Sequence, residues 1–271
     1  MKTRSHYSAV MRITSPLTLV VSTCLLLAPF SASAAEDEPA ATPYRPSVAG
    51  GATMSRPGWL DLEFGAQRLG GKRTDRRDSL PYLLKLAISE NWGVLLGGEA
   101  QIRLAPAGGN VVRGVGDTVA TLKYRLPYAG DDKAFGIEAS VKRPTAKDSL
   151  GSGKTDYGLK GIYSADLDSG FHLDVNLGVS RLGAYDATQG RTLTAWAAAM
   201  AHPVGDAWSL VLDLSGTRQR GSASTSQLLG AASYSLSKRV VFDAGMAFGL
   251  NNASPKWTAF TGVTVLLGQI F

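Results

Sequence analysis

The last sixteen residues of the chain, 256–271, constrain its fold more than any other stretch. Apolar side chains alternate there with small or polar ones at a period of two. A strand of this length with one apolar face is typical of a strand that crosses a membrane at a tilt, with lipid on one side and a polar interior on the other. The stretch predicts the closing strand of an outer-membrane β-barrel. One face carries Trp257, Val263, Val265, Leu267 and Phe271, and the other carries Gly262, Thr264 and Gly268.

Residues 1–34 predict a signal peptide for Sec-type export. Three basic residues precede the apolar run 17–30, and small residues at 32–34 suit cleavage. The run is shorter than the roughly 18 to 20 apolar residues of a membrane-spanning helix. Lipidation at Cys24 is a weaker alternative, because leucines follow this cysteine inside the apolar run. We therefore expect a chain that begins near Ala35 and reaches the outer membrane of a Gram-negative bacterium.

Composition excludes several classes of function. The formal charge of +6 falls to +3 without residues 1–34, which hold three basic and no acidic residues, so the basic balance gives little reason to expect a nucleic-acid partner. Cys24 is the only cysteine, so the exported chain has neither a disulfide nor a thiolate site. The two histidines beyond the signal, His172 and His202, lack the helical spacing of a zinc site. We predict no metal and no cofactor.

The rest of the chain divides into a leader and a barrel. Residues 35–57 are rich in Pro, Ala and Gly without periodicity, which predicts a flexible periplasmic leader. Residues 58–271 predict an all-β, antiparallel up-and-down barrel of about 12 strands, with short periplasmic turns, longer outer loops and aromatic side chains at both membrane borders. A soluble β-sandwich explains the alternation but not these borders. The predicted strands lie near 60–67, 80–89, 92–103, 116–126, 135–143, 157–167, 171–179, 192–202, 208–214, 228–236, 240–250 and 256–271.

Charged residues follow the inward phase of several predicted strands. Charges cost far less in a wet lumen than against lipid, so we expect them to line the interior. They form either a lattice of ion pairs that fixes strand register or, in part, a path for solute. The inner face of the closing strand is small and nearly uncharged, so we expect any pore between a charged wall and an open, glycine-lined one. The predicted lumen residues are Glu63, Lys85, Glu99, Arg103, Asp117, Lys123, Arg125, Glu138, Lys142, Asp156 and Lys160.

Two further segments suggest contacts outside the lumen. The run 72–78, in the first outer loop, carries Lys72, Arg73, Arg76 and Arg77. These residues could bind lipopolysaccharide phosphates, fold inward as a constriction that attracts anions, or simply be solvated. The terminal Phe271 predicts an assembly signal for the barrel-assembly machinery. The expected partners are therefore outer-membrane lipid, lipopolysaccharide, that machinery and a small-molecule solute.

Three neighbouring motifs resemble a known family. The segment 114–126 reads GVGDTVATLKYRL, and EASVKRPT at 138–145 and GSGKTDYG at 151–158 follow it. Together they resemble the outer-membrane, transporter-like family of the MetA pathway of phenol degradation. Ala146 stands where that family commonly has glycine, so the outer loop is expected to bend differently. The resemblance implies a channel for small, often aromatic compounds, and it assigns no substrate-binding residue here.

The sequence thus favours a monomeric outer-membrane channel that passes small solutes, aromatic or hydrophobic ones among them, through a polar lumen. One alternative is an outer-membrane lipid hydrolase, which needs a Ser–His pair at a membrane border. His172 is expected to point inward beside a periplasmic turn, with Asp166 as the candidate residue to face it, and neither His172 nor His202 has a Gly-x-Ser-x-Gly elbow beside it. We therefore predict no enzymatic activity. A structural barrel or adhesin without transport remains the other alternative.

Overall fold

The computed structural model describes residues 39–271 except 71–75, 107, 129, 131, 148–149, 169 and 186–187. The predicted signal peptide, Cys24, Lys72 and Arg73 lie outside the described residues. No helix among the described residues is long and apolar enough to cross a membrane. The strands are β1 (Trp59–Gly70), β2 (Arg76–Ala87), β3 (Trp92–Ala105), β4 (Val112–Gly114), β5 (Thr118–Leu126), β6 (Lys133–Arg143), β7 (Asp156–Asp166), β8 (His172–Arg181), β9 (Thr192–Val204), β10 (Trp208–Gln219), β11 (Thr225–Ser237), β12 (Val240–Gly249) and β13 (Trp257–Gln269).

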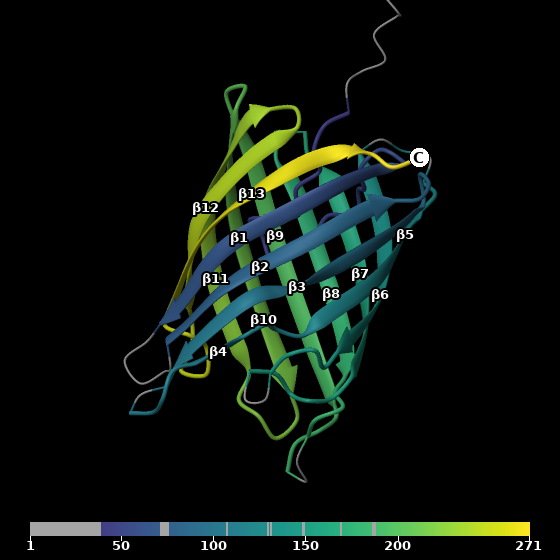
Figure 1. Ribbon diagram of the computed structural model, residues 1–271. Coiled ribbons are helices and arrows are strands. Elements are labelled where there is room, and N and C mark those ends of the chain that lie inside the picture. The colour runs from purple at the N-terminus through teal and green to yellow at the C-terminus, as the bar shows by residue number, and fades with distance from the viewer. Residues whose placement is uncertain are drawn as a thin grey trace, which may run out of the picture. The chain divides into compact units, whose positions relative to one another are not determined.

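Twelve of these strands close into an antiparallel barrel (Figure 1). Each pairs with its neighbour along the chain, and β13 closes the ring on β1 over the register Trp59↔Gln269 to Gly70↔Trp257. The short β4 pairs with the outer end of β3 on the same edge and in the same register as β5, so it continues β5 along the ring. The prediction of an up-and-down barrel of about twelve strands is confirmed. Closure removes the unpaired strand edges that a membrane interior does not tolerate.

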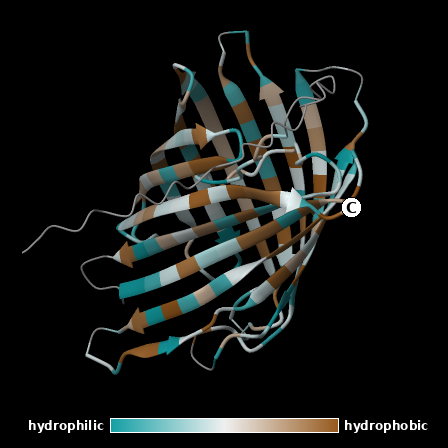
Figure 2. Ribbon diagram, turned by 45° about the horizontal axis from the view of Figure 1, so that its top comes forward, coloured by the Kyte–Doolittle hydropathy of each residue, from teal (hydrophilic) through white to brown (hydrophobic). Residues whose placement is uncertain are grey.

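Side chains alternate between the two faces of the barrel, as the strand period requires. On β8, Leu177 is 67% exposed while its neighbour Asn176 is 4% exposed, and on β10 Leu212 is 57% exposed beside the buried Asp213. The same alternation of apolar and polar residues runs along the strands in Figure 2. The exposed leucines form the surface that lipid covers, and the buried polar residues face the interior.

A β-bulge in β3 overturns one predicted orientation. Leu80 pairs with Gln101 and Pro81 with Glu99, so Ala100 is an extra residue without a partner. The bulge shifts the phase of the strand by one residue. Ile102, which the predicted inward position of Arg103 would place on the outer face, is only 1% exposed and faces the interior. Arg103, predicted to line the lumen, therefore lies on the outer face.

The connections differ in length at the two ends of the barrel. The turns 88–91, 127–132, 167–171, 205–207 and 238–239 share one end with the C-terminus, and most of the connections at the other end are longer. By the usual rule for this class, the end with short turns is periplasmic. At the outer end, Arg76 and Arg77 begin β2 and do not belong to a loop, because their backbones pair with Ala105 and Leu104 of β3. The prediction of an outer loop at these two positions is wrong.

The segment before β1 is packed inside the barrel. Residues 41–55, which we name the N-terminal plug, enter at the periplasmic end, where the Ala41 amide donates to the Lys238 carbonyl at 2.8 Å. After the plug, the chain leaves the interior at Gly58, whose amide donates a hydrogen bond to the Ala87 carbonyl. Ala49 and Ala52 are buried within it, 1% and 0% exposed. The prediction of a flexible leader over residues 35–57 does not hold for this segment, because inward polar side chains of the barrel bond its backbone.

Candidate functional site

Side chains from β7, β8 and β10 bond the middle of the plug through its backbone. Asp213 accepts hydrogen bonds from the amides of Val48 and Ala49, both at 2.9 Å. Asn176 both accepts from the Gly50 amide at 2.8 Å and donates to the Gly50 carbonyl at 2.9 Å. These bonds satisfy backbone groups that would otherwise be buried without a partner. Ser164 likewise accepts from the amide of Ala52 at 2.8 Å.

The plug is tied to β12 and β13 through one arginine. Arg45 meets Asp243 with two hydrogen bonds, Nε to Oδ2 at 3.0 Å and Nη2 to Oδ1 at 2.9 Å. Its guanidinium lies against Gly262, where a Cβ atom would come within 2.5 Å of Nε, and against Gly65 on β1. Two planar hydrogen bonds to one carboxylate make a strong and oriented pair. The glycine-lined wall, predicted to be open, is therefore occupied by Arg45.

Small inward residues also accommodate the plug. Ala49 packs in one buried cluster with Ala197 and Ala199 of β9. The alanines blur the period of β9 in the sequence, and their small size leaves room for the plug backbone at this height of the lumen. A second buried cluster joins Ala52 with Ala134 and Ile162.

Tyr44 connects the plug to two buried lysines. The Nζ atoms of Lys85 and Lys123 both approach its ring, at 4.3 and 4.2 Å from the ring centre. The Tyr44 hydroxyl accepts from Lys123 at 2.6 Å and donates to the Thr53 carbonyl at 2.9 Å. Burial, and then the nearby carboxylates of Glu138 and Glu63, raise the pKa of Tyr44 well above its usual value. The hydroxyl therefore stays protonated and keeps both bonds.

The predicted lumen charges fall into separate groups of ion pairs. On β5–β7, Glu138 lies 3.6 Å from Lys123 and 2.8 Å from Lys160. Lys142 bridges Asp156 at 2.7 Å and Asp117 at 3.1 Å. On β1–β3, the pairs are Glu63 with Lys85 at 2.5 Å and Glu99 with Arg77 at 2.6 Å. Arg125 belongs to neither group: its backbone amide and carbonyl bond Asn91, and its guanidinium forms no ion pair with the described residues. Phe271, the predicted assembly signal, is exposed at the periplasmic end.

Two cavities lie on either side of the plug, each of about 300 Å³. The outer cavity is lined by Val48, Lys160, Asn176, Ala197 and Ser215, among others. The periplasmic cavity is lined by plug residues and, on the same strands, by residues nearer the periplasm: Asp174, Ala199, Ala201, Ser209 and Val211. Asp213, which holds the plug, lies between the two sets on β10. The plug thus separates the two cavities at this level.

Sequence reasoning missed the residues that hold the plug: Arg45, Asn176, Asp213 and Asp243. The available signal was a lone acid on an inward face whose neighbours are small. A buried carboxylate needs a partner, and neither β10 nor β12 offers an inward basic residue. Backbone amides as partners leave no trace in a sequence pattern.

The histidines do not assemble a hydrolase site. Nδ1 of His172 lies 2.6 Å from Asp166, and Nε2 lies 3.4 Å from Asp174. Both ring nitrogens thus face carboxylates, and neither is directed at a serine. His202 stacks on Phe171 at 4.4 Å between ring centres. Among the described residues, no group of three or more His, Cys, Asp or Glu is placed to hold a metal ion.

Comparison with known proteins gives a family and several solved barrels. The model of the family described as "Putative MetA-pathway of phenol degradation" matches residues 42–267, a range that begins within the plug. No curated protein matches the chain.

The similar solved structures are barrels from outer membranes. An outer-membrane channel from Pseudomonas putida F1 has a TM-score of 0.62 at 13% identity, covering 80% of this chain and 98% of that one. The porin KdgM has a TM-score of 0.55 at 9% identity over 77% and 99% of the two chains. The monoaromatic hydrocarbon channel CymD has a TM-score of 0.50 at 12% identity over 80% and 90%. At these identities the likeness establishes the fold.

Proposed function

The chain belongs to the family described as putative MetA-pathway of phenol degradation, and from this premise we propose that it is an outer-membrane channel for small solutes. Aromatic or hydrophobic compounds are the expected class, because the family is described by phenol degradation and one similar barrel is described as a monoaromatic hydrocarbon channel. In the lumen of this chain, small apolar side chains lie beside paired charges, which is compatible with this class of solute. Solute passage requires the N-terminal plug to move.

The division of the lumen by the plug carries this proposal. Each cavity has the size of a small-ligand site, and the plug between them is held mainly by hydrogen bonds and one exchangeable ion pair. Such bonds are worth only about 1 kcal/mol each net, because water replaces them when they open. A few of them can therefore hold a plug that still moves. A plug packed by large apolar side chains would not exchange so readily with water.

A reversible cross-link tests the proposal. Ala49 and Ala197 belong to one buried cluster, and Cys24, the only native cysteine, falls within the predicted signal peptide. The variant A49C/A197C should form a disulfide that fixes the plug to β9. In planar bilayers, we expect the oxidised variant to conduct far less than the wild type and to recover when a reductant is added.

The single variants A49C and A197C are the matched controls and should conduct like the wild type in both redox states. Equal conductance of the oxidised and reduced double variant would mean that ions pass without plug movement, and the gating part of the proposal would fail. A barrel that is silent in every state would contradict the channel itself. Uptake assays with aromatic acids and alkanes then assign the solute class.

The outer-membrane location follows from the fold and its neighbours. We further propose Sec-type export through residues 1–34, a monomeric barrel, lipopolysaccharide as the lipid partner on the outer side, and recognition of Phe271 by the barrel-assembly machinery. Deleting Phe271 should lower the amount of inserted barrel in outer-membrane fractions. Normal insertion of that variant would remove this role from Phe271.

A further inference from the structure

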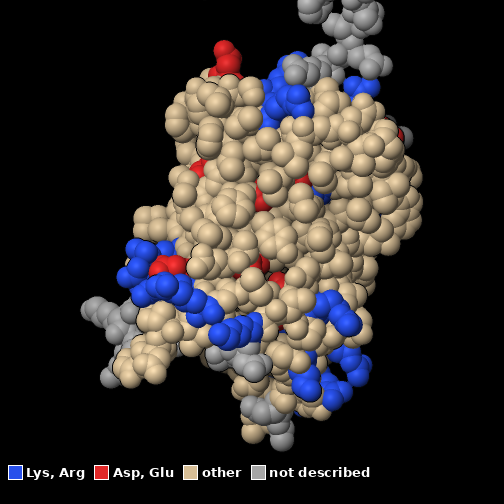
Figure 3. All heavy atoms as spheres, in the orientation of Figure 1, with Lys and Arg blue, Asp and Glu red and all other residues tan. Residues whose placement is uncertain are grey.

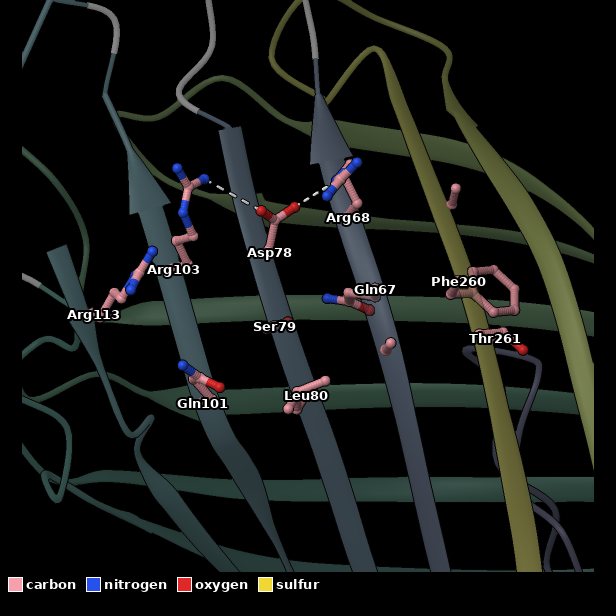
Figure 4. A pocket seen from close by; sticks show the side chains of 12 residues that line it. Gln67, Arg68, Asp78, Ser79, Leu80, Gln101, Arg103, Arg113, Phe260 and Thr261 are labelled. Carbon is pink, nitrogen blue, oxygen red and sulfur yellow. Dashed lines mark hydrogen bonds and ion pairs between the residues drawn. The ribbon is translucent and has the colours of Figure 1, made fainter. Parts of the chain in front are cut away.

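Four arginines gather on the outer face of β1–β4 near the outer end of the barrel. Figure 3 shows basic side chains around acidic atoms where these strands end. Arg68 Nε lies 2.6 Å from Asp78, Arg76 Nη2 lies 3.3 Å from it, and Arg103 Nη1 lies 3.4 Å from it. Arg68 and Arg103 point toward Asp78 from opposite sides in Figure 4. One carboxylate thus faces three arginines.

Arg113 increases this excess of positive charge. Arg113 of β4 lies directly opposite Arg103 of β3 in the strand register. None of the described residues forms an ion pair with Arg113. Like charges in directly opposite positions destabilise a strand pair. The cluster of Arg68, Arg76, Arg103 and Arg113 with Asp78, which we name the outer arginine cluster, therefore carries a formal excess of three positive charges. This excess favours an anionic ligand.

The depth of the cluster in the membrane identifies the kind of ligand. On the outward face of β1, Phe64 lies nearer the middle of the membrane than Arg68 does, and it is 39% exposed. On the other side Gly70 lies beneath the ring of Trp257, an aromatic residue of the outer border. Arg68 thus lies at the level of the lipid headgroups. Guanidinium groups cost little at that level, where lipid phosphates are abundant, and they bind phosphate with two hydrogen bonds.

The cluster borders a groove that suits a lipid. The groove has a volume of about 720 Å³ and is lined by Arg68, Asp78, Arg103 and Arg113, together with Ala66, Leu80 and Ala259. Charged residues and apolar residues therefore lie side by side on the surface that faces the membrane. We propose that this groove binds the phosphorylated sugar of lipopolysaccharide, with the acyl chains along the apolar part. The site rests on the outer-membrane location but not on solute transport.

Bound lipopolysaccharide per purified barrel, measured by native mass spectrometry, tests the site. The variant R68Q/R103Q should bind lipopolysaccharide about tenfold or more weakly than the wild type, since each charge-assisted bond contributes more than a neutral one. The control R181Q/R218Q removes the same charge from exposed positions on β8 and β10. Among the described residues, no carboxylate forms an ion pair with either of these two arginines. We expect this control to bind like the wild type.

Three probes distinguish the source of the phosphate. Lipopolysaccharide should bind, whereas chemically dephosphorylated lipopolysaccharide and vesicles of phosphatidylglycerol should bind at least several-fold more weakly. Phosphatidylglycerol that bound equally well would overturn the assignment to lipopolysaccharide, as would equal loss of binding in R68Q/R103Q and the control. Conductance of R68Q/R103Q should equal that of the wild type, so failure of the site and failure of the channel remain separable.

Arg113 keeps the test valid if R68Q/R103Q does not fold. R113Q should weaken lipopolysaccharide binding a few-fold, and in detergent free of lipopolysaccharide the barrel should be at least as stable as the wild type, because a like-charge pair is relieved. A purely structural arginine would give the opposite sign for stability. Unchanged binding by R113Q would remove this residue from the site and contradict the proposed role of the cluster.

Discussion

The wall formed by β5–β7 and the wall formed by β8–β13 satisfy their charges in different ways. On β5–β7, Glu138 and Lys142 each bridge two neighbours of opposite charge. On β8–β13, Asp213 and Asp243 have inward neighbours that are mostly small, and their partners are the plug amides and Arg45. The first wall is complete without the plug, and the second is complete only with it.

This difference separates what fixes the barrel from what fixes the plug. Changes in the β5–β7 lattice should alter folding and register, whereas changes on β8–β13 should alter plug docking while the barrel remains intact. Lys123 is the exception, because it belongs to both. It bonds Tyr44 and the Gly51 carbonyl of the plug and also pairs with Glu138.

The largest effect is expected from K123E. The side chain of Lys123 is fully buried, and the substitution places a carboxylate beside Glu138 and against the Tyr44 hydroxyl. Breaking a buried ion pair costs about 3–5 kcal/mol, and the new like charge adds to this. We expect little folded barrel, measured by heat-modifiable mobility in gels. K123M is the matched control and should fold better, because Lys160 still pairs with Glu138. Normal folding of K123E would mean that this face does not hold the lattice.

The next effect is expected from D243N, which acts on the plug alone. The substitution removes the charge that holds Arg45, a loss of about 2–4 kcal/mol of docking free energy for a pair that is buried on one side. Hydrogen exchange should accelerate at the amides of Val48, Ala49 and Gly50, while the strand amides remain protected. Channel openings should become more frequent.

The control for D243N is D206N, in the short turn 205–207, which should match the wild type in both measurements. Unchanged exchange in D243N would show that the Asp213 and Asn176 bonds hold the plug without Arg45. Global loss of protection would place Asp243 with the residues that stabilise the barrel, and the contrast between the two walls would not hold at this position.

Much of the barrel could be predicted because its cause is local. The period of two along each strand assigns residues such as Leu177 and Asn176 to opposite faces, and closure of the ring follows from the need to pair every edge. The bulge at Ala100 could not be predicted in this way. It depends on pairing with β2, and a single extra residue reverses the orientation of all that follow, which is why Arg103 was assigned to the wrong face.

The candidate site was predictable only where partners lie on adjacent strands. Glu138 and Lys160 are in register and opposite in charge, so the pair follows from the sequence. The pair of Arg45 and Asp243 joins residues 198 apart, across the lumen. The leader resembles a flexible linker because its bonds use backbone amides, which every sequence has. Gly262 looked like an open wall for a related reason, since a residue without a side chain does not show what fills the space.

Substitution of Gly262 sharpens this point with a smaller effect. In G262V the new side chain meets the guanidinium of Arg45, so plug and wall must shift, at about 1–3 kcal/mol. The matched control is G268V on the same strand, where a Cβ atom meets nothing within 4 Å. Protease should cleave the plug of G262V faster than that of G268V. Equal cleavage in the two variants would mean that the plug is not seated against β13.

The smallest effect is expected from D156N, on the wall that is complete by itself. Lys142 loses one partner but keeps Asp117 at 3.1 Å, and its side chain is 23% exposed, so water also solvates it. Partly exposed ion pairs contribute about 1 kcal/mol or less. The unfolding midpoint in urea should therefore shift only slightly, and exchange at the plug amides should stay as in the wild type. Faster exchange at the plug amides in D156N would show that the two walls are coupled through the lattice, because Asp156 on β7 bonds Lys142 and Gly183 rather than the plug.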